Sequence, residues 1–264
     1  MSRAIIKVCS LVLSAALVAI PLWACAVSNS QRALQELKRM KAERYFTNRM
    51  QAEFVAAVGH GEVERAQRLL DEGAAVDAVG DEGMTALYWA IVKQNLTGFR
   101  FLVAHDADPG TVTRWTESNG QEQWASVLEL AAMLEDSSYL RALLAAGADP
   151  NQIVNASQQT AIYHALLHRR YDNVSLLLEK GANVNHQSKS LTTPIGEAVY
   201  QGAYASALFL LRAGADPAMK NRWGKSALDT TRQFGNAGTV IGSEDEAAYP
   251  EFVAELKRRE LWGN

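Results

Sequence analysis

Cysteine is nearly missing from this sequence of 264 residues. The two cysteines, Cys9 and Cys25, both lie in an apolar stretch near the N-terminus, and residues 26–264 contain none. This distribution excludes a thiolate zinc site and an internal disulfide in the body of the chain. An excess of one charge is also missing, because the formal net charge is only -3. We therefore expect no nucleic acid partner.

Motifs of catalysis are scarce as well. The sequence has no Gly-x-Ser-x-Gly, no phosphate loop and no paired-carboxylate signature. His164 and His168 have the i, i+4 spacing of a metal-binding pair, but no acidic residue or third histidine is placed to complete a site. We expect no catalytic residue, no metal site and no cofactor, with an enzyme or a sensor of small ligands as the lesser alternative.

A basic N-terminus followed by an apolar run has the layout of a secretory signal. Arg3 and Lys7 precede an apolar stretch from Val8 to Val27, which contains Leu22-Trp23-Ala24-Cys25. This tetrapeptide resembles the lipobox of bacterial lipoproteins. The resemblance implies that residues 1–24 are a signal peptide. It also implies that Cys25 carries the lipid as the first mature residue.

The residue after Cys25 bears on the membrane of destination. Ala26 stands where an Asp retains lipoproteins in the inner membrane, so the resemblance implies an outer-membrane lipoprotein facing the periplasm. Two alternatives stay open. The stretch of about 20 residues is long enough to span the inner membrane as an uncleaved signal anchor, and a plain signal cleaved near Ala24 or Ala26 is the third interpretation. All three place the body of the chain beyond the inner membrane.

From Phe54 onward, two short apolar helices recur, and each pair ends in Gly-Ala-Asp or a close relative. The glycine position falls at residues 73, 106, 147, 181 and 214, with spacings of 33, 41, 34 and 33. A period in this range is typical of a solenoid. Glycine provides a left-handed cap at the end of the second helix, and Asp106 is a tolerated substitute.

Small and large apolar residues occupy regular places in this period. Pairs of large residues are expected to bury the second helix, at Leu69-Leu70, Leu102-Val103, Leu143-Leu144, Leu177-Leu178 and Leu210-Leu211. Alanines stand where successive first helices approach closely, at Ala57, Ala90, Ala131, Ala165 and Ala198. A large side chain there would push the repeats apart.

The turn into the first helix carries a recognisable motif. Gly83-Met84-Thr85-Ala86-Leu87-Tyr88-Trp89-Ala90 resembles the Gly-x-Thr-Pro-Leu-His-x-Ala motif of the ankyrin repeat. Copies recur at residues 158–165 and 191–198, with a looser copy at 124–131 and a last one from Gly224. The Thr or Ser hydroxyl suits the N-cap of the first helix. The resemblance implies an all-α ankyrin-repeat solenoid of helix-turn-helix repeats with short hairpin loops.

Both ends of the stack are expected to be atypical, because a terminal repeat has one face without a neighbour. We assign residues 25–50 to a lipid-anchored linker or capping helix, 51–236 to ankyrin repeats, and 237–264 to a C-terminal loop and capping helix. The loop is expected over Ala237 to Glu246, and Pro250 is expected in the first turn of the last helix.

Ankyrin partners usually bind hairpin tips and first helices, so the resemblance implies a set of contact residues on these elements. They are Asp81, Glu82, Met84, Lys93, Gln158, Gln159, His168, Tyr200, Gln201, Trp223 and Lys225. The spacing of 41 also marks an insertion of about eight residues within residues 110–124. Insertions in repeat proteins go to loops, often on the binding face. Arg114 and Trp115 in this insertion are of the types enriched at binding hot spots. The alternative for Trp115 is local packing.

The expected function is non-catalytic protein binding by a lipid-anchored ankyrin module of the bacterial cell envelope. Its partners are one or more periplasmic proteins, and its membrane contact is the lipid on Cys25. A sharper alternative is a periplasmic immunity protein that neutralises a secreted antibacterial toxin, for example a lipase effector. The two differ in the number of partners and in affinity.

Overall fold

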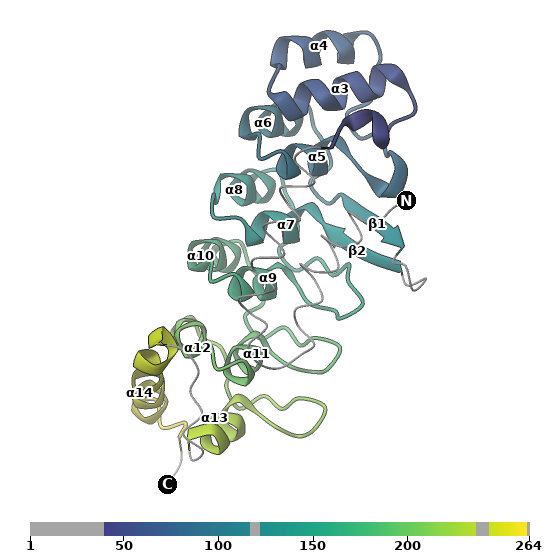
Figure 1. Ribbon diagram of the computed structural model, residues 1–264. Helices are drawn as coiled ribbons and strands as arrows, with labels where there is room; N and C mark the ends of the chain where they lie inside the picture. The colour runs from purple at the N-terminus through teal and green to yellow at the C-terminus, as the bar shows by residue number, and fades with distance from the viewer. Residues whose placement is uncertain (1–39, 117–121, 236–242, 263–264) are drawn as a thin grey trace. The chain divides into compact units, whose positions relative to one another are not determined.

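Short helices joined in pairs by tight turns form most of the computed structural model, which describes residues 40–116, 122–235 and 243–262 (Figure 1). This arrangement confirms the all-α repeat fold. The first helices of the pairs are α3 (Arg49–His60), α5 (Ala86–Val92), α7 (Val127–Met133), α9 (Ala161–Leu167), α11 (Pro194–Tyr200) and α13 (Ala227–Gly235). The second helices are α4 (Val63–Asp71), α6 (Leu96–Ala104), α8 (Ser138–Ala145), α10 (Tyr171–Glu179), α12 (Tyr204–Arg212) and α14 (Ser243–Arg258).

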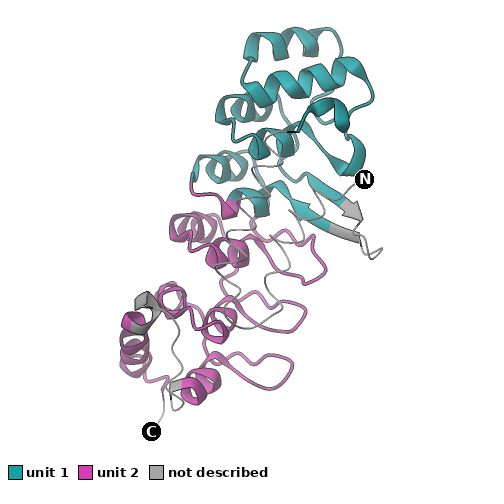
Figure 2. Cartoon of the chain, viewed as in Figure 1, with its two compact units in different colours: residues 1–131, 136–149 teal, residues 132–135, 150–264 magenta. Residues whose placement is uncertain are grey.

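The chain divides into two compact units, which Figure 2 colours separately. Unit 1 comprises residues 1–131 and 136–149, and unit 2 comprises residues 132–135 and 150–264. The pairs α3–α4 and α5–α6 belong to unit 1, and the pairs α9–α10, α11–α12 and α13–α14 belong to unit 2.

The second helix of each repeat from α4 to α12 is followed by a residue with a left-handed backbone, at the five positions predicted from the sequence. The φ angles are 105° at Gly73, 59° at Asp106, 93° at Gly147, 89° at Gly181 and 93° at Gly214. The backbone thus ends each helix in the conformation that glycine adopts without a Cβ clash. Asp106 shows that the turn, and not the glycine itself, defines the repeat boundary.

Hydroxyl side chains begin most of the first helices, as expected. Thr85 and Thr193 each accept a hydrogen bond from the backbone N–H three residues further on, at 3.2 Å. Ser226 and Asp229 cap α13 reciprocally, because each side chain accepts from the other residue's backbone N–H. Thr160 is the exception, since its side chain makes no capping bond to α9.

The interior of each unit follows the predicted pattern of small and large residues. The five alanines of the first helices are all buried, with 6% exposure at most. In unit 1, Phe99 and Tyr139 meet edge to face with ring centroids 5.1 Å apart. In unit 2, Tyr204 is fully buried, and its ring packs on Tyr249 at 4.8 Å and on Phe252 at 5.8 Å. These aromatic contacts fasten helix to helix within each unit.

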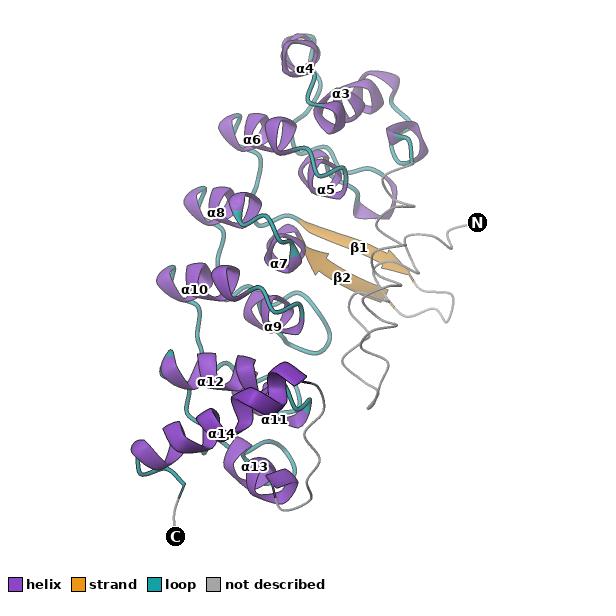
Figure 3. Cartoon of the chain, turned by 60° about the vertical axis from the view of Figure 1, so that its left-hand side comes forward, coloured by secondary structure: helices purple, strands orange, loops and turns teal. Residues whose placement is uncertain are grey.

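The predicted insertion forms two strands and not an irregular loop. Strand β1 (Val112–Thr116) pairs antiparallel with β2 (Glu122–Ser126) (Figure 3). In this register Val112 faces Ser126 and Arg114 faces Trp124. The physical reason is composition, because β1 consists mostly of Val, Thr and Trp, which favour extended backbone. Residues 117–121, between the strands, lie outside the described part.

The C-terminal helix also differs from the expectation. It begins at Ser243, so residues 243–246 are helical where a loop was expected, and Pro250 lies in its interior and not in its first turn. A proline costs one helical hydrogen bond. Burial of Phe252 and Leu256, both fully buried, offsets that cost and keeps the helix continuous.

The described part of the segment before α3, residues 40–48, covers the start of unit 1. It contains a short 3-10 turn, η2 (Ala42–Arg44), and buries Tyr45 and Phe46. The Tyr45 carbonyl accepts from the backbone N–H of Asp81 at 2.7 Å. The predicted signal peptide and Cys25 lie outside the described residues. Within the described ranges, no helix is both long and apolar enough to span a bilayer.

Candidate protein-binding surface

The first hairpin of unit 1 presents an acidic tip. Its turn is a short 3-10 segment, η3 (Asp81–Gly83), in which Asp81 is exposed and Glu82 is half-buried with a φ of 59°. Asp77 adds an exposed carboxylate to the same hairpin. The prediction for Met84 is wrong, because its side chain has 0% exposure and packs in the core.

Lys93, the other contact predicted on this part of unit 1, is engaged inside the fold. Its Nζ donates to the Met40 carbonyl at 2.6 Å and lies 4.5 Å from the centroid of the Trp89 ring. Burial lowers the pKa of the Lys93 ammonium group. The side chain therefore holds the N-terminal segment against α5 and is not free for a partner.

The strand β1 lies against the first hairpin tip of unit 1. A Cβ on Gly83 would lie 2.7 Å from the backbone nitrogen of Arg114, so the close approach of the two segments needs the glycine. The Arg114 side chain is exposed. Trp115 pairs with Gln123 through the backbone of the two strands, and its side chain lies outside the described atoms. The predicted contact through Trp115 stays a prediction.

The predicted contacts on the first helices of unit 2 include both exposed and enclosed side chains. Tyr200, the last residue of α11, is 64% exposed, and Gln201 caps the helix. The Gln201 amide donates to a Glu197 carboxylate oxygen at 2.7 Å. Burial raises the pKa of Glu197, and this hydrogen bond opposes the rise. Tyr200 is therefore an aromatic ring that the fold leaves in solvent.

The side chain of His168, which caps the C-terminus of α9, is largely enclosed by the fold. Burial, followed by the nearby His164 and Arg170, lowers the pKa of its imidazole to about 4. Its Nε2 is buried and has no hydrogen-bond partner among the described residues. At neutral pH the ring is therefore uncharged, and it is a poor candidate for a charged contact.

The hairpin tips of unit 2 are joined by backbone hydrogen bonds. The Lys189 N–H donates to the Ser157 carbonyl at 2.8 Å, and the Arg222 N–H donates to the Ser190 carbonyl at 3.0 Å. Each bond links one tip to the tip of the next repeat. The tips of this unit, which extend beyond α9, α11 and α13 in Figure 1, are therefore fixed relative to one another.

Predicted contacts on these tips are mostly exposed. Gln158 is exposed with a φ of 55°, and its carbonyl lies 2.7 Å from the His186 Nε2. Gln159 is half-buried, and its carbonyl accepts from the Asn155 amide at 2.8 Å. Trp223 is 68% exposed and Lys225 is exposed on the last tip. The structure thus brings Trp223 and Lys225 together on one turn.

Sequence reasoning missed several exposed residues of these tips, among them Leu191, Arg222 and Lys189. Leu191 is 48% exposed and has a φ of 57°. The guanidinium carbon of Arg222 lies 5.9 Å from the centroid of the Trp223 ring. Lys189 is exposed, and its backbone N–H makes one of the hydrogen bonds between the tips. Leu191 was detectable, because it stands at the glycine position of the repeat motif.

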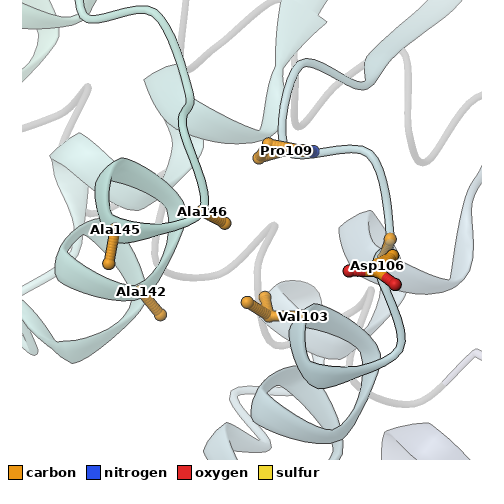
Figure 4. A pocket seen from close by; sticks show the side chains of 7 residues that line it. Val103, Asp106, Pro109, Ala142, Ala145 and Ala146 are labelled. Atoms are coloured by element: carbon orange, nitrogen blue, oxygen red, sulfur yellow. The ribbon is translucent and has the colours of Figure 1, made fainter.

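A pocket in unit 1 offers little for chemistry. It has a volume of about 410 Å³ and lies between the ends of α6 and α8 (Figure 4). Its lining consists of Val103, Asp106, Ala107, Pro109, Ala142, Ala145 and Ala146. Asp106 stands there without a base or nucleophile beside it, so the lining suits no acid–base reaction. In the part of the chain that the structure describes, no three His, Cys, Asp or Glu side chains are grouped to hold a metal.

Two long stretches of the chain match a known repeat family. The family model described as ankyrin repeats in three copies matches residues 22–113 and 128–221, which is more than half of the chain. The crystal structure of an ankyrin repeat domain from Acinetobacter baumannii AYE is similar with a TM-score of 0.60 and 24% sequence identity, over 75% of this chain and 96% of that one. The structural likeness supports the fold alone.

Curated proteins from several organisms share parts of the sequence. The chain is 24% identical over 206 residues to the E3 ubiquitin-protein ligase KEG of Arabidopsis thaliana, which covers 64% of this chain and 13% of the ligase. It is 36% identical over 100 residues to the mouse nuclear factor NF-kappa-B p105 subunit, with coverage of 36% and 10%. It is 34% identical over 116 residues to Protein PhlB of Serratia liquefaciens, with coverage of 44% and 48%. The chain spans less than half of the length of each of these relatives.

Proposed function

The chain belongs to the ankyrin-repeat family, and on that premise we propose that it binds another protein through the hairpin tips and inner helices of its repeats. Repeat stacks of this kind serve as interaction scaffolds and typically carry no catalytic site. One observation carries the proposal for this chain. Tyr200 and Trp223, on the helix and tip positions that ankyrin partners use, are 64% and 68% exposed, and neither is part of the core.

Large aromatic rings that are exposed to solvent indicate a protein-binding surface. Tyr and Trp are the residue types that most often dominate binding energy at protein interfaces. When a partner covers these rings, apolar surface that the folded monomer exposes is removed from water, and this burial stabilises the complex. The backbone ladder between the tips of unit 2 holds Trp223 in place before binding, which reduces the entropy lost on association.

We further propose that this binding takes place in the bacterial cell envelope, with the chain held by a lipid on Cys25. The support is sequence alone: Arg3 and Lys7, the apolar stretch after them, and Leu22-Trp23-Ala24-Cys25. Labelling cells with a palmitate analogue tests the anchor, because Cys25→Ser must lose the label that the parent chain takes up. A parent chain without label contradicts this part of the proposal.

A periplasmic immunity role is the sharper alternative. It is favoured by the two exposed aromatic residues of unit 2, Tyr200 and Trp223, since few strong anchors suit one tight partner. This role requires a single protein bound with nanomolar affinity, whereas a scaffold binds several proteins more weakly.

Cross-linking in the periplasm tests the binding proposal and separates the two roles. A photoreactive amino acid is placed at position 201, beside Tyr200, and cross-linked proteins are identified by mass spectrometry. Position 180, at the exposed end of α10, serves as the matched control. One specific product at position 201 favours the immunity role, and several products favour a scaffold. Identical products at both positions contradict the proposed surface.

A further inference from the structure

The tips of unit 2 differ from an ordinary solvated loop surface in charge and in apolar exposure. Lys189, Lys220, Arg222 and Lys225 are all exposed on the last two tips. Three carboxylates lie at the base of these tips: Asp216, which accepts from the Ala218 N–H at 2.8 Å, Asp229, which caps α13, and the largely buried Glu197 in the first turn of α11. The four exposed cations outnumber these carboxylates, so the tips are basic.

The balance is most one-sided around Arg222. The lysines at 220 and 225 are close enough to Asp229 to help lower its pKa, after the larger effect of hydrogen bonds from Ser226. Among the described residues, neither Arg222 nor Lys189 forms an ion pair with a carboxylate. Their side chains therefore add a positive potential that the fold does not neutralise.

Apolar side chains lie among these cations. Trp223 is 68% and Leu191 is 48% exposed, and they follow Arg222 and Ser190, whose backbones are hydrogen-bonded to each other. Leu191 also adopts a left-handed φ of 57°, whereas the equivalent residue of the next repeat is Gly224, with a φ of 71°. A leucine at this position is strained and exposed, and neither property benefits the isolated fold.

We propose that the tip surface formed by Lys189, Leu191, Arg222 and Trp223 binds an acidic segment of a protein partner that carries apolar anchor side chains between its carboxylates. This inference rests on the proposed protein-binding function and adds the chemistry of the partner. Arg222 and Lys189 pair with the carboxylates, and Leu191 and Trp223 contact the apolar anchors. The fixed spacing of the tips selects the spacing between charge and anchor along the segment.

A selection from random peptides tests this proposal without knowledge of the natural partner. The whole chain, reconstituted in phosphatidylcholine nanodiscs, is immobilised and panned against a phage library of random linear peptides. We expect enrichment of sequences with several Asp or Glu residues around a Leu, Phe or Trp. Binding of one such synthetic peptide is then measured at low and high salt, and its affinity must fall as salt rises.

Variants connect the selected peptide to the tips. Trp223→Ala is expected to weaken binding by about 30-fold, and Lys189→Glu combined with Arg222→Glu by at least as much. Leu191→Gly removes the apolar anchor while it suits the left-handed backbone, so its loss of affinity does not reflect misfolding. Lys180→Glu, at an exposed site of unit 2 away from the tips, is the matched charge control and leaves binding unchanged.

The possible outcomes separate this inference from the proposed function. Peptides without acidic enrichment, or acidic peptides that bind the tip variants as well as the parent chain, overturn the inference. Arg222-dependent capture of vesicles containing phosphatidylglycerol, in the absence of peptide selection, overturns it in favour of a membrane surface. Protein binding itself then still stands if the position-201 cross-link is specific, and falls if it is not.

Discussion

Gly98 lies where α6 crosses α3 in unit 1, and its replacement by alanine is expected to destabilise the protein. A Cβ at this position would lie 2.8 Å from the carbonyl carbon and 3.2 Å from the Cα of Val58, and closer still to the Val58 carbonyl oxygen. Carbon atoms in contact prefer about 3.5–4.0 Å. Because the obstacle is backbone, no side chain can rotate to relieve the overlap.

The size of the effect follows from two opposing contributions. Glycine to alanine inside a helix normally stabilises by about 0.5–1 kcal/mol. Overpacking against a fixed neighbour costs about 1–3 kcal/mol and sometimes more, and a rigid backbone obstacle belongs at the upper end. We expect Gly98→Ala to lower the free energy of unfolding by about 2 kcal/mol, since the second contribution outweighs the first.

Urea denaturation followed by far-UV circular dichroism measures this change. Thr97→Ala is the matched control, because Thr97 is exposed on the same turn of α6 and its replacement gains only a few tenths of a kcal/mol, about the difference in helix propensity. Gly98→Ala that is as stable as the parent chain would refute the packing argument.

Three further predictions concern unit 2. Tyr163→Phe removes a hydroxyl that lies 2.7 Å and 2.6 Å from two carbonyl oxygens of the next hairpin, so thermal unfolding should show a loss of about 1–2 kcal/mol; an unchanged Tm would contradict this role. His168 has a folded pKa of about 4, below its value of about 6.5 in an unfolded chain. The unfolded state therefore binds more protons as pH falls from about 6.5 towards 4, and stability is lost in that window. His168→Gln should show a smaller loss between neutral and acidic urea titrations, and an equal loss would reject the assignment. Tyr200→Ala and Trp223→Ala should change stability by no more than about 0.5 kcal/mol, because both side chains are exposed; a larger loss would mean that they serve the fold and not a partner.

Much of the fold follows from local patterns that the sequence displays directly. The left-handed turns at positions such as Gly73 and Asp106 recur at a readable period, and the buried alanines mark helix crossings. These features depend on residues close in sequence, so their physics is visible without coordinates. The motif at residues 83–90 locates the start of a first helix for the same reason.

The errors arose where distant parts of the chain decide. Met84 directly follows the turn at the first hairpin tip, yet its side chain is buried in the core. Lys93 is occupied by the Met40 carbonyl, a contact across 53 positions of sequence that no local pattern reveals. Pro250 was expected to begin a helix, but Phe252 and Leu256 are buried strongly enough to carry the helix through it.

The candidate surface was predictable in part. Tyr200 and Trp223 were identified from their motif positions, and both are exposed. Leu191 departs from the repeat motif, so a comparison based on the shared motif residues does not identify it. A leucine in place of glycine was the visible departure, and the left-handed backbone gives it a physical meaning.

The bonds that join the tips of unit 2 have a consequence for how this surface changes over evolutionary time. They run from the Lys189 and Arg222 amides to carbonyl oxygens, so they use the main chain and place no demand on the side chains. The side chains of Lys189 and Arg222 can therefore be exchanged without loss of these bonds, whereas His186 contacts the neighbouring tip through its side chain. Specificity for a partner can drift, and follow a partner that changes, while stability is maintained by other residues.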